Sequence, residues 1–248
     1  MVKEGVFHFN TESYLLDFKG RVPLPMIGNY LLHAASSHAG ERGFGYSDMT
    51  EKHTAWVLSR MAIEMYTYPQ MSETITLLTW VGNVGRLFTE RCFELQDKDG
   101  KPFGFARSIW AAIDLETRRP TLLDVEGLSS YISERPCPIE KPGKIHTVEN
   151  DTNVTSFTVK YSDLDINGHL NSIKYIEHLL DNFDIKMFEE KEISRFEIAY
   201  QAEGHYGMKL SIHSEQTAAE HYQMAITHEG KAICLATVTW KQENTSFY

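Results

Sequence analysis

A short stretch of the chain recurs in its second half. Residues 100–110 align without a gap with residues 230–240, and the two stretches share a Gly-Lys pair, an alanine and a final tryptophan, with apolar residues matched between them. Self-similarity at a fixed offset indicates that one structural unit has been built twice. The sequence therefore predicts two related units rather than one continuous fold.

Each half shows the same order of predicted elements, one helix followed by several strands of alternating character. The first half has a helix near 26–39 and strands at 55–66, 74–84, 87–96 and 103–114. The second has a helix at 172–184 and strands at 193–200, 208–216, 221–228 and 232–242. Asp99-Gly100 and Glu229-Gly230 supply a tight turn before each last strand. A helix lying across consecutive antiparallel strands buries the apolar face of both.

A proline-containing segment separates the halves. Pro136, Pro138 and Pro142 lie within 134–150, and proline removes backbone donors and fixes φ. We therefore predict an α+β fold with an N-terminal unit at 1–135, a linker at 136–150 and a C-terminal unit at 151–248. Two such units can pair their sheets and form an internal pseudo-dimer.

Composition excludes several classes of protein. The formal net charge of -10 argues against a nucleic-acid-binding protein, which normally needs a basic face. No apolar run reaches the roughly 18 residues of a membrane span. The start has neither a signal-peptide pattern nor a transit-peptide pattern, so we expect a cytoplasmic location. The three cysteines, at 92, 137 and 234, lack the spacing of a disulfide framework or a zinc site.

One polar cluster carries side chains suited to chemistry. Asp165, Asn167 and His169 occupy every second position, which in an extended segment places them on one side, just before the second helix. Two interpretations are open. Asp, Asn and Gly are ordinary loop and capping residues, but the same groups can supply a base and oxyanion donors for attack on a carbonyl. The equivalent approach to the first helix, 22–29, has neither Asp nor His, which favours a site. Glu203, just after a strand, is a second candidate.

At these residues the sequence resembles the acyl-acyl carrier protein thioesterases of plant plastids and bacteria. The resemblance extends over nearly the whole chain. It is carried in the first half by 29–32, 43–45, 56–61, 79–81 and 108–110, and in the second half by 162–169, Asn171 and 174–176. It implies two tandem hot-dog units, each a long helix wrapped by an antiparallel sheet, with catalysis in the second unit and the acyl pocket shaped by the first. The absence of a plastid transit segment fits a bacterial member.

The resemblance also implies roles for single residues. The catalytic Asp, Asn, His and Glu of the family fall on Asp165, Asn167, His169 and Glu203. Plant members often carry Cys at the next position, which is Gly204 here, so carboxylate chemistry is favoured over a Cys nucleophile. We predict that Glu203 activates or orients water and that Asn167 and a helix N–H hold the thioester oxygen. His169 would move the proton, and Asp165 would orient a neighbour or attack the carbonyl itself.

No metal and no cofactor is required by this chemistry. The acyl pocket is expected near the first helix and first strand, around Met49, Trp56, Leu58 and Met61. The predicted partner is acyl carrier protein bearing a fatty acyl chain, in fatty acid biosynthesis, and a homodimer is one assembly that the sequence allows.

Three other functions remain open: an acyl-CoA thioesterase, a non-catalytic acyl-binding regulatory protein and a dehydratase of the same fold. Recognition of an acidic carrier predicts a basic rim, with Arg86, Arg91, Arg118, Arg119, Lys160 and Lys174 as contributors.

Overall fold

The computed structural model describes residues 3–148 and 153–243 of the chain. It divides into two compact units, Met1–Pro142 and Gly143–Tyr248. The first unit holds five antiparallel strands in the spatial order β1 (Glu4–Asn10), β3 (Thr74–Val84), β4 (Phe88–Gln96), β5 (Pro102–Asp114) and β2 (Thr54–Met65). Its helices are η1 (Ser13–Leu15), α1 (Leu24–Gly40), α2 (Tyr46–Glu51) and α3 (Val125–Ser129).

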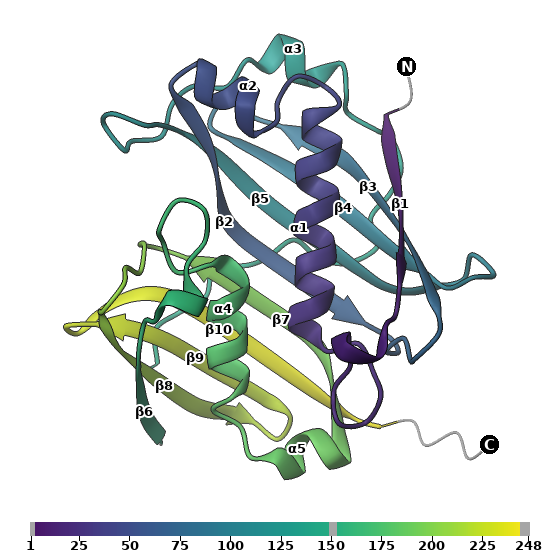
Figure 1. The fold of residues 1–248 in the computed structure, drawn as a ribbon, viewed down its shortest axis with the longest axis vertical. Coiled ribbons are helices and arrows are strands. Elements are labelled where there is room, and N and C mark those ends of the chain that lie inside the picture. The colour runs from purple at the N-terminus through teal and green to yellow at the C-terminus, as the bar shows by residue number, and fades with distance from the viewer. Residues whose placement is uncertain (1–2, 149–152, 244–248) are drawn as a thin grey trace. The chain divides into compact units, whose positions relative to one another are not determined.

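Helix α1 lies across one face of this sheet (Figure 1). Its apolar side is buried, with Ile27, Leu31 and Ala34 fully inaccessible. Two prolines at its start suit the first helical turn, where backbone N–H groups have no intrahelical acceptor. At the sheet edge, Phe9 of β1 stacks on Tyr30 of α1 with ring centroids 4.3 Å apart. Burial of these side chains against the sheet holds the helix in place.

The second unit repeats this arrangement. Its strands lie in the order β6 (Asn153–Thr158), β8 (Lys209–Ala218), β9 (His221–His228), β10 (Lys231–Gln242) and β7 (Lys191–Tyr200), all antiparallel. Its helices are η2 (Tyr161–Asp163), α4 (Ser172–Leu180), which lies over the sheet, and α5 (Ile185–Glu190). The two aligned stretches of sequence fall on β5 and β10, which hold the same place in the two sheets. The repeat is therefore structural.

The expected turns lie between β4 and β5 and between β9 and β10. Glu229 and Gly230 both have positive φ, at 49° and 77°, as a two-residue hairpin with primed-turn geometry requires. Gly100 also has positive φ, 78°, and its N–H donates to Asp97 O at 3.1 Å. Residues other than glycine rarely adopt positive φ, so the backbone of each turn favours glycine at 100 and 230.

Two details of the predicted elements are wrong. The helix expected at 172–184 ends at Leu180, because Asp184 caps a new helix by accepting a hydrogen bond from Lys186 N at 2.9 Å. Strands β1 and β6 were not expected. Each is the edge strand of its sheet, and exposed residues such as Val6 and Val154, 54% and 56% exposed, weaken the alternation that identifies a strand.

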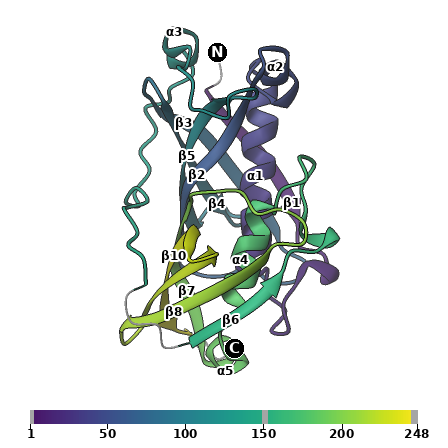
Figure 2. The same ribbon diagram turned by 90° about the vertical axis from the view of Figure 1, so that its left-hand side faces the viewer.

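Residues 136–148 form neither helix nor strand, and 149–150 of the expected linker lie outside the described residues. The segment after α3 covers the face of the first sheet opposite α1 (Figure 2). There the Arg107 guanidinium donates to the Cys137 carbonyl, and Lys141 Nζ lies 2.5 Å from Glu90 Oε2. Within the second unit, Ile145 packs on Ala199. The domain limits at 135 and 150 stay a prediction.

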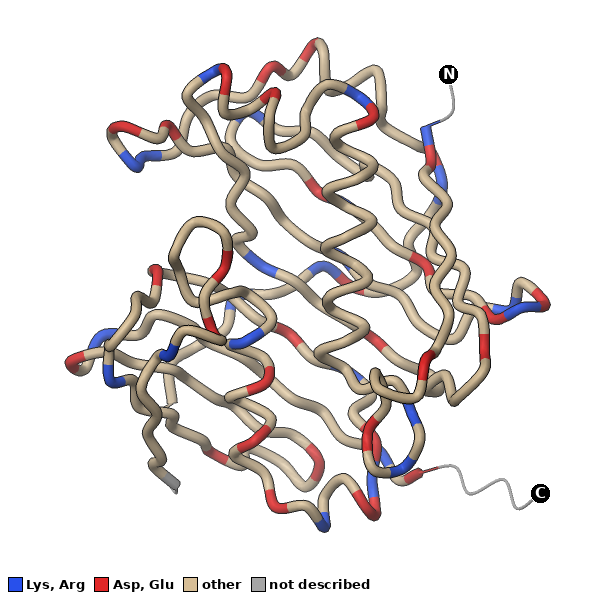
Figure 3. Tube along the Cα trace, viewed as in Figure 1, with Lys and Arg blue, Asp and Glu red and all other residues tan. Residues whose placement is uncertain are grey.

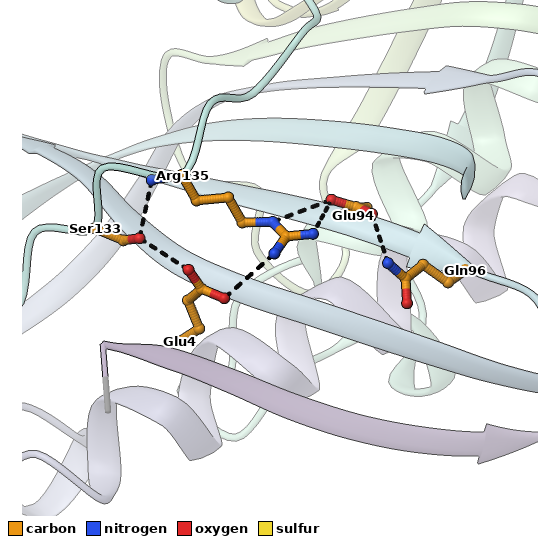
Figure 4. A network of polar contacts seen from close by, with 5 residues as sticks. All are labelled: Glu4, Glu94, Gln96, Ser133 and Arg135. Carbon is orange, nitrogen blue, oxygen red and sulfur yellow. Dashed lines mark hydrogen bonds and ion pairs between the residues drawn. The ribbon is translucent and has the colours of Figure 1, made fainter. Parts of the chain in front are cut away.

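Arg135 holds the start of this segment onto the first sheet (Figure 4). Its Nη2 donates to Glu94 Oε2 at 2.6 Å and its Nη1 to Glu4 Oε2 at 3.4 Å. Ser133 Oγ donates to the same Glu4 at 3.0 Å, and Gln96 donates to Glu94. Because the Glu94 side chain is only 8% exposed, its charge depends on these donors.

Acidic and basic residues are interspersed along both units (Figure 3). Among the described residues, no helix is long and apolar enough to cross a membrane.

Candidate functional site

The polar cluster forms a closed turn rather than the extended segment that its spacing predicted. Leu164 and Leu170 pair as an antiparallel bridge, and the chain reverses between them at Gly168, with φ at 76°. Asp165 organises the turn, since its Oδ1 accepts from Asn167 N at 2.8 Å and from His169 N at 3.1 Å. Asp165 N donates in turn to His169 O at 2.8 Å. A tight turn was missed because i, i+2 spacing alone does not distinguish an Asx turn from a strand.

The turn places His169 against the loop between β7 and β8. His169 and His205 pair as an antiparallel bridge, and Leu170 N donates to Gly204 O at 2.8 Å. His169 Nε2 thereby lies 3.4 Å from Glu203 Oε2. These two residues come from segments far apart in the sequence, and both are partly open to solvent, with side chains 23% and 40% exposed. The imidazole and the carboxylate can exchange a proton over this distance with a small adjustment.

Tyr175 of α4 forms hydrogen bonds to the backbone of the loop that carries Glu203. Its hydroxyl accepts from Gly204 N at 2.9 Å and donates to Ala202 O at 3.4 Å, so it bonds the backbone on both sides of Glu203. The residue is 3% exposed, and burial raises the pKa of its hydroxyl, so the group stays neutral. Sequence does not mark Tyr175 as a site residue, because an aromatic residue on a helix is most simply explained as core.

Gly204 leaves no room for a side chain. An added Cβ would lie 3.0 Å from Leu170 Cβ and 3.1 Å from the Tyr175 hydroxyl. The Cys that plant relatives were expected to carry at this position therefore cannot be accommodated here without a shift of the neighbours.

Asn167 lies at the tip of the turn with an exposed side chain. It is not the helix cap. Asn171 fills that role, accepting from Ile173 N at 2.8 Å, and Tyr200 donates its hydroxyl to Ser172 O at 2.8 Å. The helix start is thus fixed by Asn171 and Tyr200 and not by the polar cluster. His205 was not predicted as a site residue, although its i+2 spacing from Glu203 repeats the spacing of the first cluster.

The residues predicted for the acyl pocket all belong to the first unit. The register between β2 and β5 shifts between Leu58 and Arg60, and this bulge places Trp56, Leu58 and Met61 on one face. Leu58 and Met61 are buried, at 6% and 1% exposure. Trp56 Nε1 donates to Phe44 O at 2.9 Å. Met49 is buried in α2 at 7% exposure. These positions suit either core packing or an acyl-binding wall.

Arg91 is not part of a surface rim, contrary to expectation. Its Nη1 lies 2.9 Å from Nδ1 of His38 in α1 and 3.3 Å from Thr79 Oγ1. Burial lowers the pKa of Arg91 to about 10, and burial together with the Arg91 charge lowers the pKa of the inaccessible His38 to about 3. The other five predicted contributors stay candidates, and Lys174 is already paired with Glu177 at 2.5 Å.

Comparison with known families identifies both halves. The model for the acyl-ACP thioesterase N-terminal domain matches residues 6–131, and that for the C-terminal domain matches residues 146–242. The chain belongs to the acyl-ACP thioesterase family. The protein is therefore built of the two tandem hot-dog units that the sequence predicted. The pairing of the two sheets stays a prediction.

Solved structures agree with this family member over nearly its whole length. An acyl-ACP thioesterase from Bacteroides thetaiotaomicron is 43% identical, with a TM-score of 0.91 over 96% of this chain and 98% of that one. The 12:0-ACP thioesterase from Umbellularia californica has a TM-score of 0.89 over 98% of this chain and 99% of that one, at 20% identity, which supports the fold alone.

Curated relatives of this family member are longer. A chloroplastic acyl-[acyl-carrier-protein] hydrolase from Cuphea viscosissima is 28% identical over 98% of this chain. The chloroplastic oleoyl-acyl carrier protein thioesterase 2 of Arabidopsis thaliana is 28% identical over 79% of it. The chain spans 64% and 58% of the lengths of these two proteins.

Proposed function

We propose that this protein is an enzyme that hydrolyses the thioester between a fatty acyl chain and acyl carrier protein, releasing a free fatty acid. Membership of the family supports this reaction. The observation that carries it is the approach of His169 Nε2 to Glu203 Oε2 at 3.4 Å, because it brings a base and a proton carrier together from two separate loops.

Glu203 acts as the general base. Its carboxylate takes a proton from a water molecule as that water attacks the thioester carbon, and the C–S bond breaks when the tetrahedral intermediate collapses. His169, beside it, receives this proton from Glu203 and passes it to the departing thiolate, so both side chains return to their starting state and the products are a fatty acid and the carrier thiol. The exposed Asn167 amide is the candidate donor to the developing oxyanion.

Asp165 acts as a positioning residue in this proposal. Its Oδ1 already binds the backbone N–H groups of Asn167 and His169, which supports a role in holding those two residues over a role as nucleophile. Asparagine keeps an equivalent oxygen, so Asp165→Asn preserves the turn and Asp165→Ala removes it. A nucleophile would be lost in both variants.

The acyl chain binds in the first unit, near Met49, Trp56, Leu58 and Met61. Acyl carrier protein is the proposed carrier in preference to coenzyme A, because the names of the relatives share it. The cytoplasmic location and the homodimer stay predictions.

The test measures thiol release from a panel of acyl carrier protein and coenzyme A thioesters. Glu203→Gln should reduce kcat by about a hundredfold or more while the protein stays folded. Glu229→Gln is the matched control, because this acid lies in the β9–β10 turn of the same unit. Wild-type turnover in Glu203→Gln would remove the base from the mechanism, and absence of turnover on every thioester would reject the hydrolase.

A further inference from the structure

The proposed base, Glu203, lies in a cluster of three side chains that could bind a metal ion. His169, Glu203 and His205 each present one nitrogen or oxygen atom, and these three atoms all lie within 4.8 Å of one another. The two histidines face each other across the backbone bridge between their segments, with ring centroids 5.0 Å apart and planes at 84°. His205 has no role in the hydrolysis proposed above.

The donor set selects a class of ion. Two imidazoles and one carboxylate match the preference of Zn²⁺ and similar transition-metal ions, and three protein ligands leave a position for water. Mg²⁺ and Ca²⁺ prefer sites built of oxygen, so a single carboxylate does not favour them. Bonds of about 2.0–2.2 Å would require the ligand atoms to move closer together. Glu203 and His205 are exposed and His169 is partly so, which lets an ion reach them from solvent.

The backbone beneath these ligands is held firmly. Gly204 lies between Glu203 and His205. Its carbonyl accepts from Leu170 N and its N–H donates to the Tyr175 hydroxyl, so the backbone that carries these two ligands is fixed to the His169 turn and to α4. Because the backbone is already fixed, binding an ion would cost only the freedom of the three side chains. An ion held there would coordinate the carboxylate and the imidazole that the proposed hydrolysis uses.

We propose that His169, Glu203 and His205 form a binding site for a divalent transition-metal ion such as Zn²⁺, and that occupation of this site inhibits the enzyme. The inhibition rests on the proposed function. The binding does not, because it follows from the donor set and its geometry alone.

Calorimetry on the chelator-treated full chain tests the binding directly. Zn²⁺ should bind with one ion per chain, and Mg²⁺ at the same concentration should not. His205→Asn should weaken Zn²⁺ binding by roughly tenfold or more, since one ligand of three is lost. His228→Asn is the control, because His228 is a partly exposed histidine of the same unit whose Nδ1 bonds Lys209 O. Replacement of Zn²⁺ by Co²⁺ should give the visible absorption of a site with nitrogen ligands. Absence of Zn²⁺ binding, or equal binding by wild type and His205→Asn, would overturn the site.

Turnover tests the inhibition separately. Zn²⁺ should slow thioester hydrolysis over the concentration range in which it binds, and chelator should restore the rate. Each variant is compared with its own rate in chelator, and His205→Asn should need roughly tenfold or more Zn²⁺ for half inhibition. A chelated enzyme that is inactive until Zn²⁺ is added would overturn the inhibitory role. A chain that binds Zn²⁺ as predicted but hydrolyses no thioester would reject the proposed function and leave the binding site standing.

Discussion

Removal of one hydroxyl group should separate the stability of the second unit from the positioning of its proposed base. Tyr175→Phe deletes the group that bonds Gly204 N at 2.9 Å and Ala202 O at 3.4 Å and leaves the aromatic ring in place. Gly204 is buried, so its N–H would lose its acceptor away from water. An unsatisfied buried donor costs about 1–3 kcal/mol. For a chain of this size, each kcal/mol of lost stability lowers Tm by about 2–4 °C.

The same change should lower the rate of hydrolysis. Glu203 lies between the two backbone groups that Tyr175 binds, so loss of both bonds lets the carboxylate move relative to His169. Misplacement of a catalytic group by about 1 Å can reduce the rate by about a hundredfold. We expect kcat for acyl carrier protein thioesters to fall by about tenfold to a hundredfold, with a smaller change in KM, because the proposed acyl-binding residues belong to the other unit.

Tyr200→Phe is the matched control. Tyr200 is half-buried, its ring packs on that of Tyr175 with centroids 5.5 Å apart, and its hydroxyl bonds Ser172 O at 2.8 Å rather than the Glu203 loop. Both variants should lose stability in urea denaturation, but only Tyr175→Phe should lose kcat. Equal kcat values in the two variants and wild type would show that the Tyr175 hydroxyl does not position Glu203.

Three further changes test other parts of the structure. Gly204→Ala places a Cβ 3.0 Å from Leu170 Cβ and should destabilise the protein by about 1–3 kcal/mol in urea denaturation. His38 has a pKa lowered to about 3, chiefly by burial, so below about pH 6.5 the unfolded chain binds a proton that the folded chain does not. Stability should therefore fall as pH is lowered, by up to about 1.4 kcal/mol per pH unit from this residue, and His38→Gln should reduce that slope between pH 6 and 5. Arg135→Met leaves the Glu94 carboxylate buried without its cation and should cost about 3 kcal/mol in the same assay.

Each change has its own control. Gly40→Ala should be tolerated, because an added Cβ there meets nothing within 4 Å, and equal costs at the two glycines would contradict the steric argument. His33→Gln removes an exposed histidine of the same helix, and an equal loss of slope in that variant would contradict the assignment to His38. Addition of Glu94→Gln to Arg135→Met should recover part of the loss, and a double variant no more stable than the single one would contradict the charge argument.

The sequence alone determined the repeated architecture, apart from the two edge strands and the end of α4. Two copies of one pattern, a helix and then alternating strands, predicted two similar sheets, and the strands expected at 74–84 and 221–228 have those bounds in the structure. Alternation identifies these strands because each sheet buries one face against a helix, so apolar residues recur at every second position. It failed for β1 and β6, where an edge strand exposes apolar residues, and for the end of α4, where a capping Asp begins a new helix.

The site was predicted only as a set of residues. Sequence spacing drew attention to Asp165, Asn167 and His169, but it implied an extended segment where the chain makes an Asx turn. The approach of His169 to Glu203, the Tyr175 hydroxyl beneath them and the position of His205 depend on hydrogen bonds between segments far apart in the chain. Local pattern reports which face of an element is buried. Which side chains meet is decided by how the loops at the ends of those elements pack together, and only the tertiary structure contains that information.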